Sequence, residues 1–362
     1  MQHKIRLSRA NIDIKAYARK LSLPLSFVLP IAVLYLLDPN SFQWAWKGRA
    51  PYIFFLWFLC LELILIWKNF PRSTFEMPKW GRTLATLILM IIPTVYVSAL
   101  FLIGLNNTII ELGKSVVPEL YQEYYPWFLY SSWPLSVEYL TLAILFTLST
   151  LLAYGIEGVK RFSVSLFFLG ATGLSYMIDN IYPFGTLIAL QSLVPITATL
   201  ATLPLNFIGY PTQLRHYSYT KIISGVRIRE LVTVMEIENT SPTLRFAINW
   251  PCAGVHSLFI YSLASLLFIK NFSIPTKWKV IYFVIGAIGT FLVNVLRIIT
   301  IVIIGINAGM EVAMTFHSYY GELFFISWIL TYFLIITYGH RIIAPISYIA
   351  IKLKRQETPF DS

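Results

Sequence analysis

The chain has 362 residues, of which 57% are hydrophobic and only 12% are charged, whereas roughly a quarter of an ordinary soluble domain is charged. Runs of about 18 or more apolar residues recur along its length, as is typical of a polytopic membrane protein. This pattern excludes a soluble enzyme, a disordered chain and a fibrous repeat. The net charge of +11 must therefore be mapped onto the two sides of a membrane before any acidic partner is inferred from it.

Apolar segments predict the membrane helices, which in chain order are 21–37, 52–67, 84–105, 133–154, 163–178, 186–206, 252–269, 280–304 and 316–338. Nineteen of the 28 Lys and Arg residues lie in five connections, at 1–20, 68–83, 155–162, 270–279 and 339–362. Because positive residues stay on the cytoplasmic side, these connections and both chain ends are predicted inside. The remaining connections face outside, at 38–51, 106–132, 179–185, 208–250 and 305–315.

One segment conflicts with this alternation. The chain must cross the membrane once between 162 and 211, but it has two apolar runs there, 163–178 and 186–206. Gln191, Pro195 and Thr197 weaken 186–206 as a lipid-facing helix, so we predict a re-entrant or interfacial helix on the outer side. The predicted fold is all-α: a polytopic membrane bundle of about eight transmembrane helices with this extra helix. A small extracytoplasmic loop at 208–250 contains β-structure, because Val226–Glu238 alternates well enough for one or two strands.

Three reactive side chains are expected at one depth near the outer interface. Cys252 is predicted to start helix 252–269, where backbone N–H groups and the helix dipole lower a thiol pKa. Arg297 lies seven residues before the end of helix 280–304, roughly 10 Å below it. His317 is predicted near the start of helix 316–338. A single cysteine or histidine at a helix end is usually inert, but a buried Arg costs at least about 2.5 kcal/mol and usually has a partner.

These residues lie in three motifs that resemble those of the exosortase/archaeosortase family of membrane cysteine transpeptidases. The motifs are Cys252-Ala253-Gly254, Asn294-Val295-Leu296-Arg297-Ile298 and His317-Ser318-Tyr319-Tyr320-Gly321. Their order and spacing fit the family, as does a site on the outer side of the membrane. The resemblance covers about 180–325, and the 208–250 insert is longer than is usual in the family. On this interpretation the chain divides into an N-terminal four-helix membrane region (1–162), a catalytic membrane core (163–338) and a cytoplasmic tail (339–362).

The resemblance implies a multi-pass cell-membrane enzyme that cleaves a C-terminal sorting signal of exported proteins. That signal comprises a short motif, a hydrophobic helix and a basic tail, and the new carboxyl end passes to a lipid acceptor. Cys252 would attack the carbonyl, His317 would act as general base and then acid, and Arg297 would stabilise the oxyanion or orient the pair. We expect exported proteins and a membrane lipid as partners, and no cofactor, metal or nucleic acid.

Neighbouring residues have supporting or competing roles. His256 lies four residues after Cys252 and would share its helix face, which makes it a rival base. Asn294 lies one turn before Arg297 and either orients it or bonds between helices. Gly254 is expected to permit close backbone approach near the nucleophile.

Two other classes of function remain open from the sequence. In a transporter or lipid-carrier-binding protein, Arg297 would bind an anionic headgroup and Cys252 would be incidental. A glycosyltransferase using a polyprenyl-phosphate donor would need an acidic pair in an outer loop, and 38–51 offers only Asp38. An acyl-enzyme at Cys252 distinguishes the transpeptidase from both.

Overall fold

The computed structural model describes residues 21–43, 48–67, 79–124, 126–182, 187–223, 226–238, 243–250, 252–271, 275–321 and 323–336. The basic N-terminus at 1–20 and the predicted tail at 339–362 lie outside these residues. The chain forms two compact units, each of which is described by itself.

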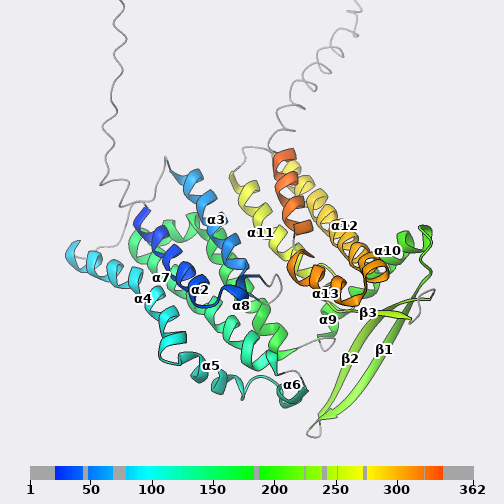
Figure 1. Cartoon of the computed structure of the whole chain (residues 1–362). Helices are drawn as coiled ribbons and strands as arrows, with labels where there is room; N and C mark the ends of the chain where they lie inside the picture. Colours follow the sequence, from blue (N-terminus) through cyan, green and yellow to red (C-terminus); the bar gives the residue numbers. More distant parts are fainter. Residues whose placement is uncertain are drawn as a thin grey trace, which may run out of the picture. The chain divides into compact units, whose positions relative to one another are not determined.

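The first unit consists of the described residues of Met1–Phe42, Arg49–Ser115 and Trp133–Leu174. Its helices are α2 (Val28–Leu37), η1 (Pro39–Phe42), α3 (Pro51–Ile66), α4 (Lys79–Leu102), α5 (Leu105–Gly113), α7 (Trp133–Arg161) and the first part of α8 (Ser163–Ile181). Helix α4 packs against both α2 and α7 (Figure 1). Between the helices, the ring of Phe146 meets those of Phe27 and Phe55 edge to face, at 4.9 and 5.5 Å between centroids, a favourable aromatic geometry.

A buried charged cluster also lies in the first unit. The Arg49 guanidinium forms ion pairs of 2.7 Å with Glu138 and with Asp38, and the hydroxyl of Tyr52 donates to Glu138 at 3.0 Å. Burial by itself lowers the pKa of Arg49, but the negative charge of Glu138 and its hydrogen bonds outweigh that effect and raise the pKa above its ordinary value. The Arg49–Glu138 pair links the loop before α3 to the start of α7.

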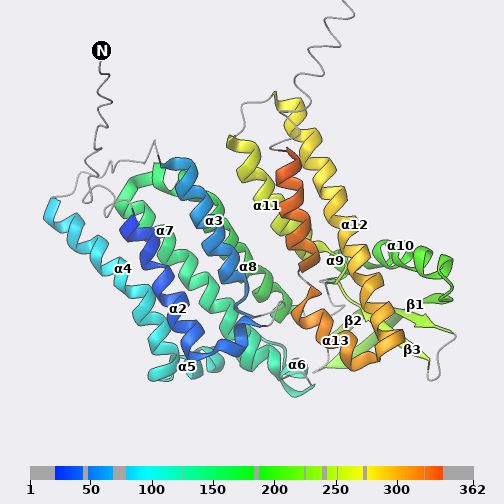
Figure 2. The same ribbon diagram turned by 45° about the horizontal axis from the view of Figure 1, so that its top comes forward.

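The second unit consists of the described residues of Gln43–Gly48, Val116–Ser132 and Ser175–Ser362. Its helices are α6 (Glu119–Tyr124), η2 (Phe128–Ser132), α9 (Ile188–Gln191), α10 (Val194–Phe207), α11 (Val255–Asn271), α12 (Thr276–Ala308), α13 (Met310–Tyr319) and a last helix, Leu323–Ile336. Helices α11, α12 and Leu323–Ile336 lie side by side (Figures 1 and 2). The indole N–H of Trp328 donates to Thr290 Oγ1 at 3.1 Å, which joins the last helix to α12.

The loop predicted to hold one or two strands forms a three-stranded antiparallel sheet. Its strands are β1 (Thr212–Ile223), β2 (Val226–Ile237) and β3 (Leu244–Ile248), in the order β1-β2-β3. Alternate side chains point to opposite faces of a strand, and on one face of this sheet they pack with α10 and α12. The core formed there consists of Val194, Ala198, Ala201, Leu205, Met235, Ile237, Ile248, Trp250, Ala253, Val295, Ile298 and Val302.

Four helices among the described residues are long and apolar enough to cross a membrane: Thr83–Leu102, Phe128–Arg161, Ser163–Ile181 and Thr276–Ala308. The pair Met310–Tyr319 and Leu323–Ile336, bent by 42°, makes a fifth if it is one span. Three shorter apolar helices, Leu21–Leu37, Pro51–Ile64 and Val255–Leu266, coincide with the other predicted spans. The protein is thus a mostly helical membrane protein with a small sheet, and the count of eight spans stays a prediction.

The segment 186–206 forms α9 and α10 rather than one long helix. Helix α10 has 14 residues, fewer than the 17 or so needed to cross a membrane. Its buried positions, among them Thr197, Ala198 and Ala201, face the core, while Ile196, Leu203 and Phe207 are exposed. An apolar outer face agrees with the predicted re-entrant or interfacial position, which stays a prediction.

Candidate functional site

Cys252 lies in a tight turn between β3 and α11. Its N–H and that of Ala253 both donate to the carbonyl of Asn249, at 2.9 and 3.1 Å. Helix α11 begins only at Val255, so the prediction that Cys252 starts this helix is wrong. The physical reason is Gly254, whose φ of 90° is a left-handed conformation that cannot continue a right-handed helix.

The Nε2 atom of His317 lies 3.7 Å from Cys252 Sγ. The histidine lies in the last turn of α13, not at the start of a helix over 316–338 as predicted. Helix α13 is separate because Gly309, at a φ of 93°, interrupts the chain after α12. The contact therefore joins two turns that are 65 residues apart in the sequence.

Asn294 and Arg297 lie three residues apart on α12, so both occupy one face of that helix. Both are buried, with 3% and 7% of their surfaces exposed. The Asn294 side chain donates from Nδ2 to the Cys252 carbonyl at 2.9 Å. Arg297 is 11 residues before the end of α12 at Ala308, rather than the seven predicted, or about 16 Å along the axis.

The glycines that close two of the motifs lie where the chain contacts α12 closely. A Cβ atom at Gly254 would lie 2.9 Å from Asn294 Nδ2, and a Cβ at Gly321 would lie 3.6 Å from Arg297 Cδ. The first distance is too short for a carbon contact. Gly254 therefore lets the turn that carries Cys252 approach Asn294 closely.

His256 lies in the first turn of α11, and 7% of its surface is exposed. Since Cys252 precedes that helix, the two residues do not share a helix face, and the geometric reason for treating His256 as a rival base is lost. His317 is the histidine whose ring nitrogen the structure places 3.7 Å from the sulfur.

Two buried side chains that the motifs do not contain also bond the backbone on either side of Cys252. Gln191 accepts a hydrogen bond from the Trp250 N–H at 2.9 Å and donates to the Ile248 carbonyl at 3.4 Å. Thr197 donates from its hydroxyl to the Ala253 carbonyl at 3.2 Å. The signal in the sequence was the same polar character that weakened 186–206 as a lipid-facing helix.

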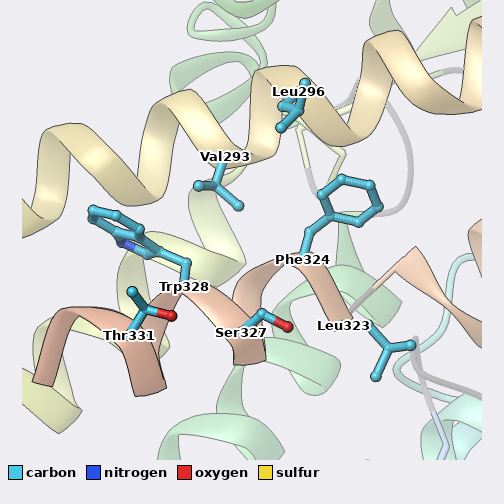
Figure 3. A pocket seen from close by; sticks show the side chains of 7 residues that line it. All are labelled: Val293, Leu296, Leu323, Phe324, Ser327, Trp328 and Thr331. Atoms are coloured by element: carbon cyan, nitrogen blue, oxygen red, sulfur yellow. The ribbon is translucent and has the colours of Figure 1, made fainter. Parts of the chain in front are cut away.

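A groove of about 380 Å³ lies between α12 and the last helix (Figure 3). Two of its lining residues are close to the motifs in the sequence: Leu296 directly precedes Arg297, and Leu323 follows Gly321 by two residues. Its lining is apolar except for two hydroxyl groups and consists of Val293, Leu296, Leu323, Phe324, Ser327, Trp328 and Thr331.

A family model described as transmembrane exosortase matches residues 120–334, more than half of the chain. This chain belongs to the exosortase family. The matched part of the exosortase includes all six predicted site residues and the whole sheet. No curated protein and no solved structure matches the chain.

Proposed function

We propose that this exosortase is a cysteine transpeptidase that cleaves the C-terminal sorting signal of exported proteins and transfers the new carboxyl end to a membrane lipid. The observation that carries the proposal is the 3.7 Å contact between Cys252 Sγ and His317 Nε2, which belongs to a membrane protein of this family. A thiol beside an imidazole is the arrangement from which cysteine nucleophiles are activated.

In the first step, His317 takes the thiol proton as Cys252 Sγ bonds to the carbonyl carbon of the scissile peptide. The peptide C–N bond then breaks, His317 gives the proton to the departing amine, and a thioester remains on Cys252. In the second step, a nucleophilic hydroxyl or amine of the lipid attacks the thioester carbon. Its proton passes through His317 to the sulfur, which restores the thiol.

Arg297 has the charge needed to stabilise the oxyanion that forms in both steps. Its guanidinium is buried beside Gly321 on the helix face that also presents Asn294. Fixed donors in a site that excludes water are worth more than the same donors in water. A lysine would replace the planar fork with a point charge on a flexible stem.

The proposal places the site at the extracytoplasmic side, with both chain ends in the cytoplasm. A substrate helix held in the bilayer with its basic tail inside would present its short motif at the depth of Cys252. The apolar groove between α12 and the last helix, lined by Leu296 and Leu323, would suit a hydrophobic substrate segment held within the membrane.

The first test replaces the nucleophile in cells that make a substrate with the complete sorting signal. Cys252→Ala should leave the precursor uncleaved while the enzyme accumulates normally, and Cys60→Ser, which removes the other cysteine, should cleave as the parent does. Mass spectrometry of the parent should find a thioester at Cys252. Normal cleavage by Cys252→Ala would overturn the proposal, and a transporter or a glycosyltransferase would form no thioester.

The second test compares the two histidines. His317→Ala should lower the cleavage rate by about 10²–10⁴-fold, as expected for positioned proton transfer, and His256→Ala should lower it far less. Arg297→Lys should be severely impaired. If His256→Ala abolished cleavage and His317→Ala did not, His256 would be the base.

A further inference from the structure

The turn that carries Cys252 is held by three buried side chains from three different helices. Gln191 belongs to α9, Thr197 to α10 and Asn294 to α12, and their exposed fractions are 2%, 0% and 3%. Together they bond four backbone groups on either side of the nucleophile: the Ile248 carbonyl, the Trp250 N–H, the Cys252 carbonyl and the Ala253 carbonyl.

Gln191 has a particular relation to the strand before the turn. The Trp250 N–H and the Ile248 carbonyl are two residues apart and so point to the same side of an extended chain. A neighbouring strand would accept from the one and donate to the other, and the Gln191 amide does both. The side chain thus takes the place of a strand partner where β3 ends, four residues before Cys252. If Gln191 were replaced by an apolar residue, the buried Trp250 N–H and Ile248 carbonyl would lose these hydrogen bonds, which costs free energy.

Thr197 acts on the other side of the nucleophile. Its hydroxyl lies 3.2 Å from the carbonyl of Ala253, the residue directly after Cys252, and 3.4 Å from the Leu193 carbonyl within α10. The hydroxyl of the nearby Thr199 donates within α10, to the Pro195 carbonyl at 2.8 Å. Of these two threonines, therefore, Thr197 is the one that bonds the backbone next to Cys252.

We infer that Gln191 and Thr197 are positioning residues, which together with Asn294 hold Cys252 Sγ within hydrogen-bond distance of His317. The inference rests on the proposed role of Cys252 as nucleophile. Displacement of a reacting group by about 1 Å can cost about 10²-fold in rate. Cys252 lies in a turn and not in a helix, so the position of its sulfur depends on the hydrogen bonds that hold this turn.

The test measures the thiol directly and needs no substrate. In full-length Cys60→Ser protein in detergent, Cys252 is the single cysteine, and its rate of alkylation by iodoacetamide is followed against pH. His317→Ala defines the profile of a thiol without its imidazole partner. Gln191→Leu and Thr197→Val should move the parent profile toward that of His317→Ala. The matched controls Gln213→Leu, on the exposed face of β1, and Thr199→Val should leave the profile unchanged.

Cleavage kinetics and conservative variants separate positioning from general stability. Gln191→Leu and Thr197→Val should lower kcat by about 10–100-fold with little change in KM, and Thr197→Ser, which keeps the hydroxyl, should restore both kcat and the alkylation profile. Gln191→Glu keeps the size of the side chain and the acceptor for Trp250 but loses the donor to Ile248, so it should be intermediate. Gln191→Glu decides the question if Gln191→Leu does not fold.

The outcomes distinguish the two proposals. Parent-like profiles and kcat for both Gln191→Glu and Thr197→Val would overturn the positioning roles. Equal profiles for the parent and His317→Ala would instead show that no thiol–imidazole pair forms, which would overturn the proposed function.

Discussion

At the scale of single residues, the site depends on Gly254 for two separate reasons. Its φ of 90° is a conformation that an L side chain rarely adopts, and a Cβ there would meet Asn294 at 2.9–3.1 Å. Gly209 has a similar φ of 95° with nothing within 4 Å of its Cβ position. Gly254 and Gly209 therefore share the unusual backbone conformation, but only at Gly254 would a side chain also clash with a neighbour.

Gly254→Ala should abolish cleavage, because the methyl group displaces the Asn294 amide that bonds the Cys252 carbonyl. Gly209→Ala should cost only the backbone strain, about 1–2 kcal/mol of stability, and keep its cleavage activity. Cleavage assays and thermal unfolding in one detergent would measure both effects. Similar activity losses in the two variants would mean that backbone strain, not the contact with Asn294, accounts for the loss.

At the scale of helices and loops, buried carboxylates join elements of the first unit. Glu138 of α7 pairs with Arg49, which precedes α3. Glu62 of α3 accepts from the backbone N–H groups of Val164 and Ser165 at 2.9 and 3.2 Å, where the first N–H groups of α8 have no partner within their own helix. These bonds are directional, so the two acids specify which elements lie together, whereas apolar contacts between leucines are not directional.

Glu138→Ala should destabilise the protein by about 3–5 kcal/mol, since it leaves the Arg49 charge buried without its main partner. The control is Glu157→Ala, which removes a half-exposed pair with Arg161 four residues away on α7. Such surface pairs contribute about 0.3–0.5 kcal/mol. Thermal unfolding of the two variants in detergent should separate them clearly, and equal shifts would contradict a structural role for the buried pair.

At the scale of the whole molecule, the orientation in the membrane is a prediction from the distribution of Lys and Arg. In a background without Cys60 and Cys252, a cysteine at Tyr219, which is exposed on β1, should react with an impermeant maleimide added outside intact cells. A cysteine at Lys160, near the end of α7, should react only after the membrane is opened. Reaction of both from outside would place the sheet and the 155–162 connection on one side and refute the predicted alternation.

Most helices were predictable from the sequence because each depends on a local apolar run. The segments 163–178 and 280–304 lie within α8 and α12, which extend beyond them. The breaks were harder, because they depend on backbone conformation. Gly254 and Gly309 have positive φ values, and these decide that α11 starts after the cysteine and that α13 begins as a helix separate from α12. Apolar character on both sides of a glycine does not reveal such a break.

The sequence by itself determined the membrane class, the approximate helices and the three motifs, because composition, hydropathy and the order of residues are local properties of the chain. Only the tertiary structure decided which histidine meets the sulfur, because residues 252 and 317 approach each other through the packing of α11, α12 and α13. It also decided that Gln191 and Thr197 bond the backbone on either side of Cys252. These hydrogen bonds join residues that are 56 and 59 positions apart. A single sequence does not reveal such pairs, because nothing in it says which distant group a buried polar side chain will bond.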